Sequence, residues 1–339
     1  MRQQCVWFDA PFKISVRDEA MPSIAPDQVL VQTVVSAISA GTELLFYRGQ
    51  VPSGTQIDAT IGALSGEASY PLKYGYACVG HVIEIGAHVS DDWQGRLVFS
   101  FQPHTRHFVA SVDELIPVPD GITPGQAALL PNLETAVNLV MDGAPIIGER
   151  VAVLGQGIVG LLTAELVARM PMAQLITFDY FSLRREKARA LGIAHTFNPN
   201  DAKAMGDAHA LLGSSGADLT FEISGNPDAL NLAIELTGFD GRIIVGSWYG
   251  QKKSAIDLGG KFHRSRIRLI GSQVSTIAPQ LSGRWSKARR IDLAWSMLAR
   301  LPWGELVTHR IPISDAASAY ELLDQHPEQV LQVMLTYDV

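Results

Sequence analysis

Three glycines at a fixed spacing are the residues of this chain whose chemistry is easiest to infer. Gly155, Gly157 and Gly160 form a G-x-G-x-x-G motif that directly follows an apolar segment and opens a helical pattern. The first glycine permits a tight turn, the second lets backbone approach a pyrophosphate, and the third lets the helix pack closely on the strand. Free N–H groups at the start of that helix attract phosphate oxygens. The motif therefore predicts a dinucleotide site, and a bound nicotinamide would bring hydride-transfer chemistry.

An acidic residue sets the expected cofactor preference. Asp179 stands nineteen residues after Gly160, at the end of the next apolar segment. A carboxylate there accepts hydrogen bonds from a ribose 2′-hydroxyl and repels a 2′-phosphate. The sequence thus favours NAD, with NADP as the alternative. Arg184 and Arg185 follow closely, and they either soften this preference or are solvated helix charges.

A regular alternation of patterns positions this motif. Apolar segments typical of strands recur after residue 150 and are separated by helical patterns, the strands falling at 151–155, 174–179, 194–199, 217–225, 241–248 and 266–273. The intervening helices are expected to about 170, at 182–192, at 202–212 and at 226–238. Six strands interleaved with helices predict an α/β fold with a doubly wound parallel sheet.

The residues on either side of this region have a different texture. Residues 1–115 carry short strand patterns, as at 28–39, 77–86 and 95–101, broken by Gly and Pro. A Pro- and Gly-rich connector leads into a helix expected near 124–131. From about 286 the chain is helical again, and it ends in a predicted strand at 332–339 that could return to the first domain.

Composition excludes several classes of protein. The 339 residues are 47% apolar and 18% charged, which favours two domains with sizeable cores. The net charge is −7 and no basic stripe is present, so nucleic acid is not an expected partner. Cys5 and Cys78 are the only cysteines, which excludes a disulfide scaffold. Without an apolar signal core or a membrane-length apolar run, the chain is expected to be cytoplasmic, with no membrane contact.

Taken in the order in which they occur along the chain, the motifs resemble the medium-chain dehydrogenase/reductase superfamily over nearly the whole chain. The resemblance is carried by GTELLFYRG (41–49), the glycine motif, FEISGNPDAL (221–230) and ISDAASAYELL (313–323). It implies a GroES-like β-rich catalytic domain at 1–134, a Rossmann NAD-binding domain at 135–275, and a segment at 276–339 that returns to the catalytic domain. SAISAGTELLFYRG and YGYACVG are also distantly similar to the bacteriochlorophyllide hydroxyethyl dehydrogenases, where an acidic residue replaces Ala77.

The resemblance also locates the metal slots of the zinc-dependent members. Ala40, Tyr76 and Pro131 occupy the three positions that those members use as ligands. None of these side chains can bind zinc, so we expect no catalytic metal. The structural zinc cysteines are absent as well.

Without zinc, hydroxyl groups must transfer the proton and stabilise the negative charge that develops on the substrate oxygen. By its position in the resemblance, Tyr76 is the expected hydrogen-bond donor to the substrate oxygen, and Thr42 with Glu43 would complete a proton relay to solvent. Tyr76 alternatively fills the volume that the metal would take. Glu134 either reaches the same cleft or caps a helix. The residues expected to bind the cofactor are Thr135, Gly155, Gly157, Ile158, Val159, Gly160, Asp179, Arg184, Ser224, Gly225, Gly246, Ser247 and Trp248.

Three functions remain open at this stage. The first is a zinc-independent NAD(H) dehydrogenase or carbonyl reductase acting on a small alcohol or carbonyl compound. The second is a quinone or enone reductase, and the third is a non-catalytic NAD-binding redox sensor. Lys261, with His263, Arg264 and Arg266, would bind an anionic substrate or line a dimer edge. We expect a homodimer through the last Rossmann strand, 266–273, because an exposed apolar edge favours pairing.

Overall fold

The computed structural model describes residues 2–52, 54–57 and 61–337. The chain divides into two compact units, one formed by Met1–Pro131 with Trp295–Val339 and the other by Asn132–Ala294. The family resemblance implies boundaries after residues 134 and 275, whereas the structure assigns residues 132–134 and 276–294 to the second unit as well.

The second unit is built on one parallel sheet. Its strands run in the spatial order β10-β9-β8-β11-β12-β13, and every adjacent pair is parallel. The strands are β8 (Arg150–Leu154), β9 (Gln174–Phe178), β10 (His195–Phe197), β11 (Ala217–Glu222), β12 (Thr237–Val245) and β13 (Arg268–Gly271). This order reverses direction between β8 and β11, which confirms the doubly wound sheet predicted from the sequence.

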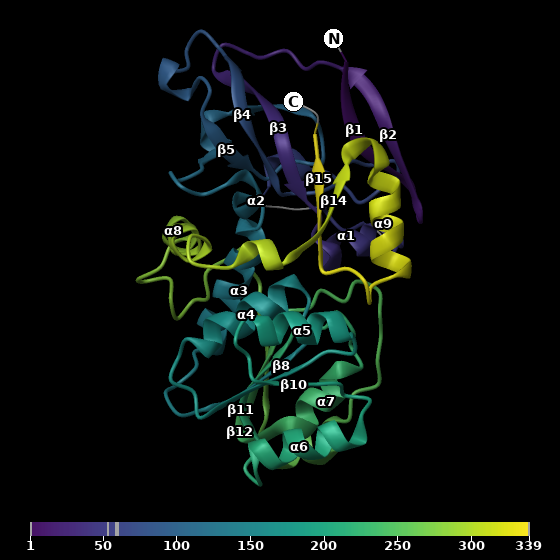
Figure 1. Cartoon of the computed structure of the whole chain (residues 1–339), viewed down its shortest axis with the longest axis vertical. Helices are drawn as coiled ribbons and strands as arrows, with labels where there is room; N and C mark the ends of the chain where they lie inside the picture. The colour runs from purple at the N-terminus through teal and green to yellow at the C-terminus, as the bar shows by residue number, and fades with distance from the viewer. Residues whose placement is uncertain (1, 53, 58–60, 338–339) are drawn as a thin grey trace. The chain divides into compact units, whose positions relative to one another are not determined.

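Helices cover both faces of this sheet. The unit contains the helices α3 (Leu130–Gly143, from Asn132 on), α4 (Ile158–Ala168), α5 (Ser182–Ala190), α6 (Ala202–Leu212) and α7 (Ala229–Leu236), and the first part of α8 (Lys287–Leu298). Figure 1 shows α4 and α5 on one side of the strands and α6 and α7 on the other. Apolar residues of the strands and of α6 and α7, such as Ile176, Phe178 and Leu212, form the buried core between these layers.

A buried ion pair anchors α8 to the second unit. Arg290 of α8 is fully buried, and its guanidinium donates to Glu134 Oε1 through Nε at 3.1 Å and Nη2 at 2.8 Å. It also donates to Asn138 Oδ1 and to the carbonyls of Val274 and Thr276. Glu134 therefore pairs with a buried positive charge instead of capping the start of α3. Each of the three guanidinium nitrogens of Arg290 has a protein acceptor in place of water.

The first unit is mostly antiparallel. A seven-stranded sheet has the order β14-β15-β3-β4-β5-β7 with β6 also paired to β3, and a separate hairpin is formed by β1 and β2. The strands are β1 (Arg2–Ala10), β2 (Lys13–Ala20), β3 (Gln28–Ala37), β4 (Cys78–Ile85), β5 (Leu97–Ser100), β6 (His107–Ser111), β7 (Ile116–Pro117), β14 (Val307–Pro312) and β15 (Gln332–Thr336). Its helices are α1 (Ala40–Tyr47), α2 (Pro124–Ala127) and α9 (Ala316–Gln325).

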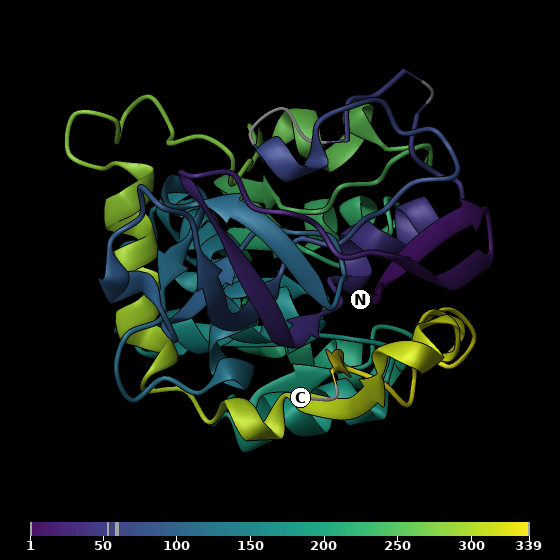
Figure 2. The same ribbon diagram turned by 90° about the horizontal axis from the view of Figure 1, so that it is seen from above.

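The two ends of the chain contribute to this unit together. β15 pairs antiparallel with β3, from Met334 opposite Ala37 to Thr336 opposite Val35. Both views show the yellow C-terminal segment, including α9, beside the purple N-terminal strands (Figures 1 and 2). Asp338 and Val339, the last residues of the predicted final strand, lie outside the described residues.

The helix expected near 124–131 is divided in the structure. Thr123 and Gln126 form a capping box around α2, which starts at Pro124. The chain then begins α3 at Leu130, and Pro131 stands in the first turn of that helix. Because proline has no N–H to donate, it is tolerated in a first turn but not in the interior of a continuous helix.

Candidate functional site

The glycine motif lies where the parallel sheet reverses its order. Gly155 follows β8 with φ +93°, and a Cβ on it would lie 2.6 Å from the Cα of Ser224, which follows the neighbouring β11. A Cβ on Gly160 would lie 1.9 Å from the carbonyl oxygen of Gly155. Neither position accepts a side chain, because backbone occupies the space. Gly157 is the N-cap of α4, and a Cβ there would meet nothing within 4 Å.

This arrangement fits a dinucleotide phosphate. The first turn of α4 leaves its N–H groups without partners inside the helix, and no side chain caps it. Gly157 and Val159 are half-buried, whereas Gly155, Ile158 and Gly160 are buried. An open glycine at a helix N-terminus, placed at the crevice where strand order reverses, is the geometry that holds a pyrophosphate.

Asp179 lies directly after β9 and is bound to the same turn. Its Oδ2 accepts the N–H of Gln156 at 2.7 Å, and its Oδ1 accepts the N–H of Phe181 at 2.9 Å. A carboxylate has about four lone-pair sites, so two acceptor sites remain for a ribose hydroxyl. Arg184 Nη1 lies 3.8 Å from Oδ2, with its guanidinium over the Phe181 ring. Burial lowers the pKa of Arg184, and the Asp179 carboxylate opposes that shift.

A second buried carboxylate shapes the turn after β11. Glu222 is fully buried, and its Oε1 accepts the N–H of Ser224 at 2.8 Å while its Oε2 accepts the hydroxyl of Tyr249. Burial, reinforced by this negative charge, raises the pKa of Tyr249, so its phenol stays a donor. Gly225 N–H in turn donates to Ser247 Oγ at 2.9 Å. The turns after β11 and β12 are therefore fixed to each other.

The remaining residues expected at the cofactor lie on the same edge of the sheet or on α3. Gly246 follows β12 closely against α3, because a Cβ there would lie 2.6 Å from Leu139 Cδ2. Trp248 is exposed, with 39% of its surface accessible. Thr135 is half-buried on α3, next to Glu134. The structure thus places the predicted residues after β8, β9, β11 and β12 at the carboxyl ends of adjacent parallel strands.

The first unit contains a buried polar network that was not evident from the sequence. Glu43 of α1 and His104 have no exposed side-chain surface, and His104 Nε2 lies 3.0 Å from Glu43 Oε2. Tyr320 of α9 donates its hydroxyl to the same carboxylate oxygen. On the other side of the imidazole, Nδ1 lies 2.7 Å from Ser36 Oγ, which lies 2.7 Å from the hydroxyl of Tyr337. Five side chains from distant parts of the sequence thus share one chain of hydrogen bonds.

Tyr76 lies close to this network in the fold. The side chain is half-buried against an apolar cluster, with its ring edge-on to Tyr74 at a centroid distance of 6.1 Å. Thr42, two residues after the start of α1, is also half-buried. Glu43 differs from both, because it has no surface from which to exchange a proton with solvent directly.

The histidine and cysteine pairs near Tyr76 do not converge. Cys78 Sγ donates to the carbonyls of Gln102 and Pro103, and burial raises the pKa of its thiol. His81 is exposed and bonds the Gly95 carbonyl, whereas His104 is buried with Glu43. Across residues 2–52, 54–57 and 61–337, no three His, Cys, Asp or Glu side chains are grouped as metal ligands.

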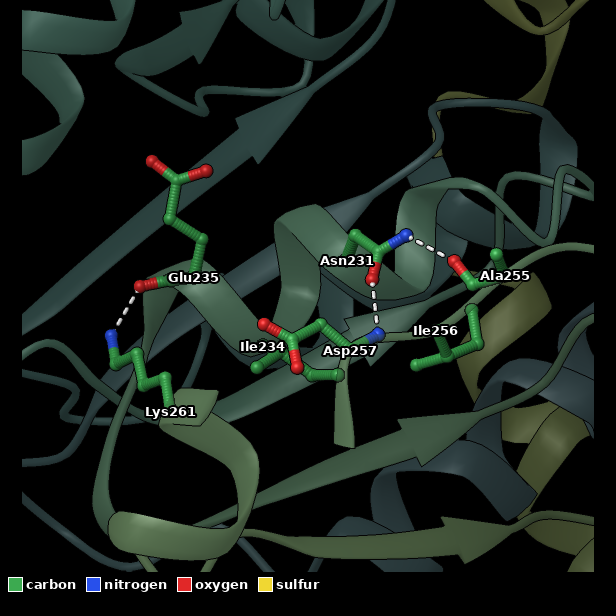
Figure 3. Close-up of a pocket in the computed structure, with 7 residues that line it drawn as sticks. All are labelled: Asn231, Ile234, Glu235, Ala255, Ile256, Asp257 and Lys261. Atoms are coloured by element: carbon green, nitrogen blue, oxygen red, sulfur yellow. Dashed lines mark hydrogen bonds between the residues drawn. The ribbon is translucent and has the colours of Figure 1, made fainter. Parts of the chain in front are cut away.

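Lys261 belongs to an open pocket of about 570 Å³ beside α7. Figure 3 shows that its ammonium group donates to the Glu235 carbonyl, and that the Asn231 side chain bonds the Ala255 carbonyl and the Asp257 N–H. Burial lowers the pKa of Lys261, and Glu235 opposes the shift. The polar groups of this pocket mainly hold its own loop in place.

Comparisons with known proteins agree with this geometry. Residues 159–291 match the family described as zinc-binding dehydrogenase. The chain is 24% identical to the D-guloside 3-dehydrogenase of Escherichia coli K12, covering 93% of this chain and 94% of that protein. It is also 24% identical to the D-xylulose reductase of Saccharomyces cerevisiae, covering 96% and 95% respectively.

Solved structures share the whole fold. An Escherichia coli oxidoreductase/dehydrogenase of unknown specificity, involved in membrane biogenesis, has a TM-score of 0.81 at 16% identity and 100% coverage of both chains. A Sinorhizobium meliloti structure described as a zinc-binding dehydrogenase bound to NADP has a TM-score of 0.78 at 18% identity, covering 99% of each chain. An Escherichia coli alcohol dehydrogenase complexed with NADH has a TM-score of 0.77 at 18% identity, also covering 99% of each chain.

The chain is thus similar to zinc-binding dehydrogenases over residues 159–291, and over most of its length to a dehydrogenase and a reductase. The solved structures confirm the α/β fold expected from the sequence. In the described part of the chain, no helix combines the length and apolar character needed to cross a membrane.

The glycine motif yields a matched pair of variants. Gly160→Ala should destabilise the protein by about 1–3 kcal/mol or more, since its methyl group would overlap the Gly155 carbonyl. Gly157→Ala should cost clearly less, because its methyl group enters open space and only the poorer N-cap preference of alanine counts against it. Urea unfolding followed by circular dichroism measures both. Equal stabilities for the two variants would contradict the close packing of α4 on β8.

Proposed function

We propose that this protein is a nicotinamide-dependent oxidoreductase that transfers hydride between the cofactor and a small alcohol or carbonyl substrate, without catalytic zinc. The observation that carries the proposal is the open glycine N-cap of α4 at the point where strand order reverses. The relatives named above support an alcohol or carbonyl substrate, since they are a dehydrogenase and a reductase of sugar-like molecules.

In this proposal the chain binds the cofactor through the second unit. The first turn of α4 receives the pyrophosphate, and the Asp179 carboxylate receives the ribose. Bound nicotinamide supplies the hydride acceptor or donor. The Glu222–Tyr249 and Gly225–Ser247 contacts hold the neighbouring turns in a fixed shape, so that the site needs little ordering on binding.

We assign hydrogen bonding to the reacting oxygen of the substrate to hydroxyl groups of the first unit. In the reducing direction Tyr76 donates its phenolic hydrogen to the substrate oxygen as the hydride reaches the carbon, and Thr42 resupplies Tyr76 with a proton. Zinc independence is supported by the residues at the three positions where the resemblance places metal ligands. These residues are Ala40, Tyr76 and Pro131, and none of their side chains is a zinc ligand.

The Asp179 carboxylate leads us to expect NADH to bind more tightly than NADPH. The difference should be tenfold or more, about 1.4 kcal/mol, because a 2′-phosphate would face a negative charge. Asp179→Asn should reduce the difference in affinity between NADH and NADPH. Arg184→Ala should increase that difference by removing the nearby positive charge. Fluorescence titrations with both cofactors measure this. A preference for NADPH in the unaltered protein would mean that Arg184 dominates the carboxylate.

For catalysis, Tyr76→Phe is the informative change. Removing only the hydroxyl should lower kcat roughly 10²-fold or more, the usual effect of losing an acid–base or oxyanion contact. NADH affinity should stay the same, and turnover should survive chelation of metals. The assay uses NADH or NAD with sugars, polyols, ketones, enones and quinones.

The control for this change is Tyr76→Ala. If Tyr76 only fills space, Tyr76→Phe keeps full activity while Tyr76→Ala loses stability through the cavity that it opens. Turnover with enones or quinones alone would support the enone reductase alternative. Tight NADH binding with no turnover of any compound would support the redox sensor.

We further propose a homodimer formed through β13. This strand is the edge of the parallel sheet, and Leu269 on it is 44% exposed. An apolar edge strand presents unpaired backbone groups to a second copy. Light scattering at micromolar concentration should give twice the monomer mass. Leu269→Asp should shift the protein towards monomer, and Ile146→Asp, an equally drastic change at an exposed site outside β13, should not.

A further inference from the structure

We propose that Glu43 is a positioning residue: its buried carboxylate fixes the helix that carries Thr42 to the turn that carries Tyr76. This inference rests on the proposed function for its catalytic meaning. The structural part rests on contacts within the first unit alone. It replaces the relay to solvent that the sequence suggested for Glu43, because the carboxylate is fully buried.

One oxygen of Glu43 holds its own helix. Oε1 accepts the backbone N–H of Ser39 at 2.7 Å, just before the first residue of α1. This donor is one of the N–H groups that a helix start leaves unsatisfied, and burial makes the bond costly to lose. The orientation of the first turn, where Thr42 lies, therefore depends on the position of this carboxylate.

The other oxygen holds the imidazole of His104. That imidazole lies directly beneath the turn before Tyr76, since a Cβ on Gly75 would be 2.6 Å from His104 Cδ2. Gly75 has φ +119°, a conformation that side chains disfavour. The backbone N–H of His104 also donates to the Tyr74 carbonyl at 3.2 Å. The position of the imidazole thus determines where the turn carrying Tyr76 can lie.

The direction of the hydrogen bonds is consistent along the whole network. With a neutral imidazole protonated on Nε2, His104 and Tyr320 both donate to Glu43, Ser36 donates to His104 Nδ1, and Tyr337 donates to Ser36. Burial, reinforced by Glu43, raises the pKa of Tyr320, and burial raises the pKa of Tyr337. Both phenols therefore keep their hydrogen, and the two donors to Glu43 Oε2 can use its two lone pairs.

A direct contact between the two elements reinforces this coupling. Tyr74, one residue before Gly75, stacks on Phe46 of α1 with ring centroids 3.8 Å apart. Tyr76 then packs edge-on against Tyr74. A shift of α1 that follows loss of the carboxylate contacts would therefore be passed to the Tyr76 ring through packed aromatic groups.

The test places 3-fluorotyrosine at position 76 of the full chain and records its ¹⁹F resonance without cofactor. The variants are Glu43→Gln and Tyr320→Phe. The matched control is Tyr47→Phe, a phenol of the same apolar cluster that packs against Tyr320 and outside the Glu43 network. We expect one sharp resonance in the unaltered protein and in the control, and a broadened or divided resonance in both test variants.

Activity gives the second readout. Where turnover is found, Glu43→Gln should lower kcat about tenfold or more while the KM for NADH stays within twofold, since the cofactor residues are untouched. A broadened or divided resonance in both test variants of a protein with no turnover would support the positioning role and reject the proposed function. If Tyr320→Phe leaves the resonance as sharp and unshifted as Tyr47→Phe does, the positioning role is wrong. This comparison remains decisive even if Glu43→Gln does not fold.

Discussion

A carboxylate removed from water needs donors on all sides, and this requirement organises both units of the protein. Isolated burial of such a charge would cost many kcal/mol, so a stable fold must bring N–H, O–H or guanidinium groups to it. Glu43, Glu134 and Glu222 are each almost or fully buried and each have such donors. The surrounding turns and helices are held where those donors are needed.

The two units satisfy this requirement in different ways. In the second unit, parallel strands bring successive turns to one edge of the sheet, so Asp179 and Glu222 bind backbone N–H groups of their own or neighbouring turns. In the first unit, Glu43 accepts the nearby Ser39 N–H at one oxygen, and its other oxygen accepts from His104 and Tyr320, which are far apart in the sequence. The cofactor side of the proposed enzyme thus follows from topology, whereas the substrate side follows from side-chain convergence.

The similarity to known dehydrogenases is compatible with this difference. TM-scores near 0.8 at identities below 20% show a shared backbone arrangement. Sheet order and the close approach of α4 to β8 require only apolar patterns and a few glycines, so very different sequences can build them. A set of residues such as Ala40, Tyr76 and Pro131 can then differ in chemistry without any change in the sheet.

The sequence by itself determined the parallel sheet, the position of the glycine turn, and Asp179 at the end of the next strand. These features depend on local patterns: the alternation of strand and helix, and glycines needed where backbone meets backbone. The sequence did not determine the partners of Glu43, Glu134 and Glu222. Nothing local to Glu43 predicts His104 or Tyr320, and His104 drew attention only for its spacing from His107. Tertiary structure alone decided these pairs, because the free energy of burying a charge depends on which distant donors the folded chain brings to it.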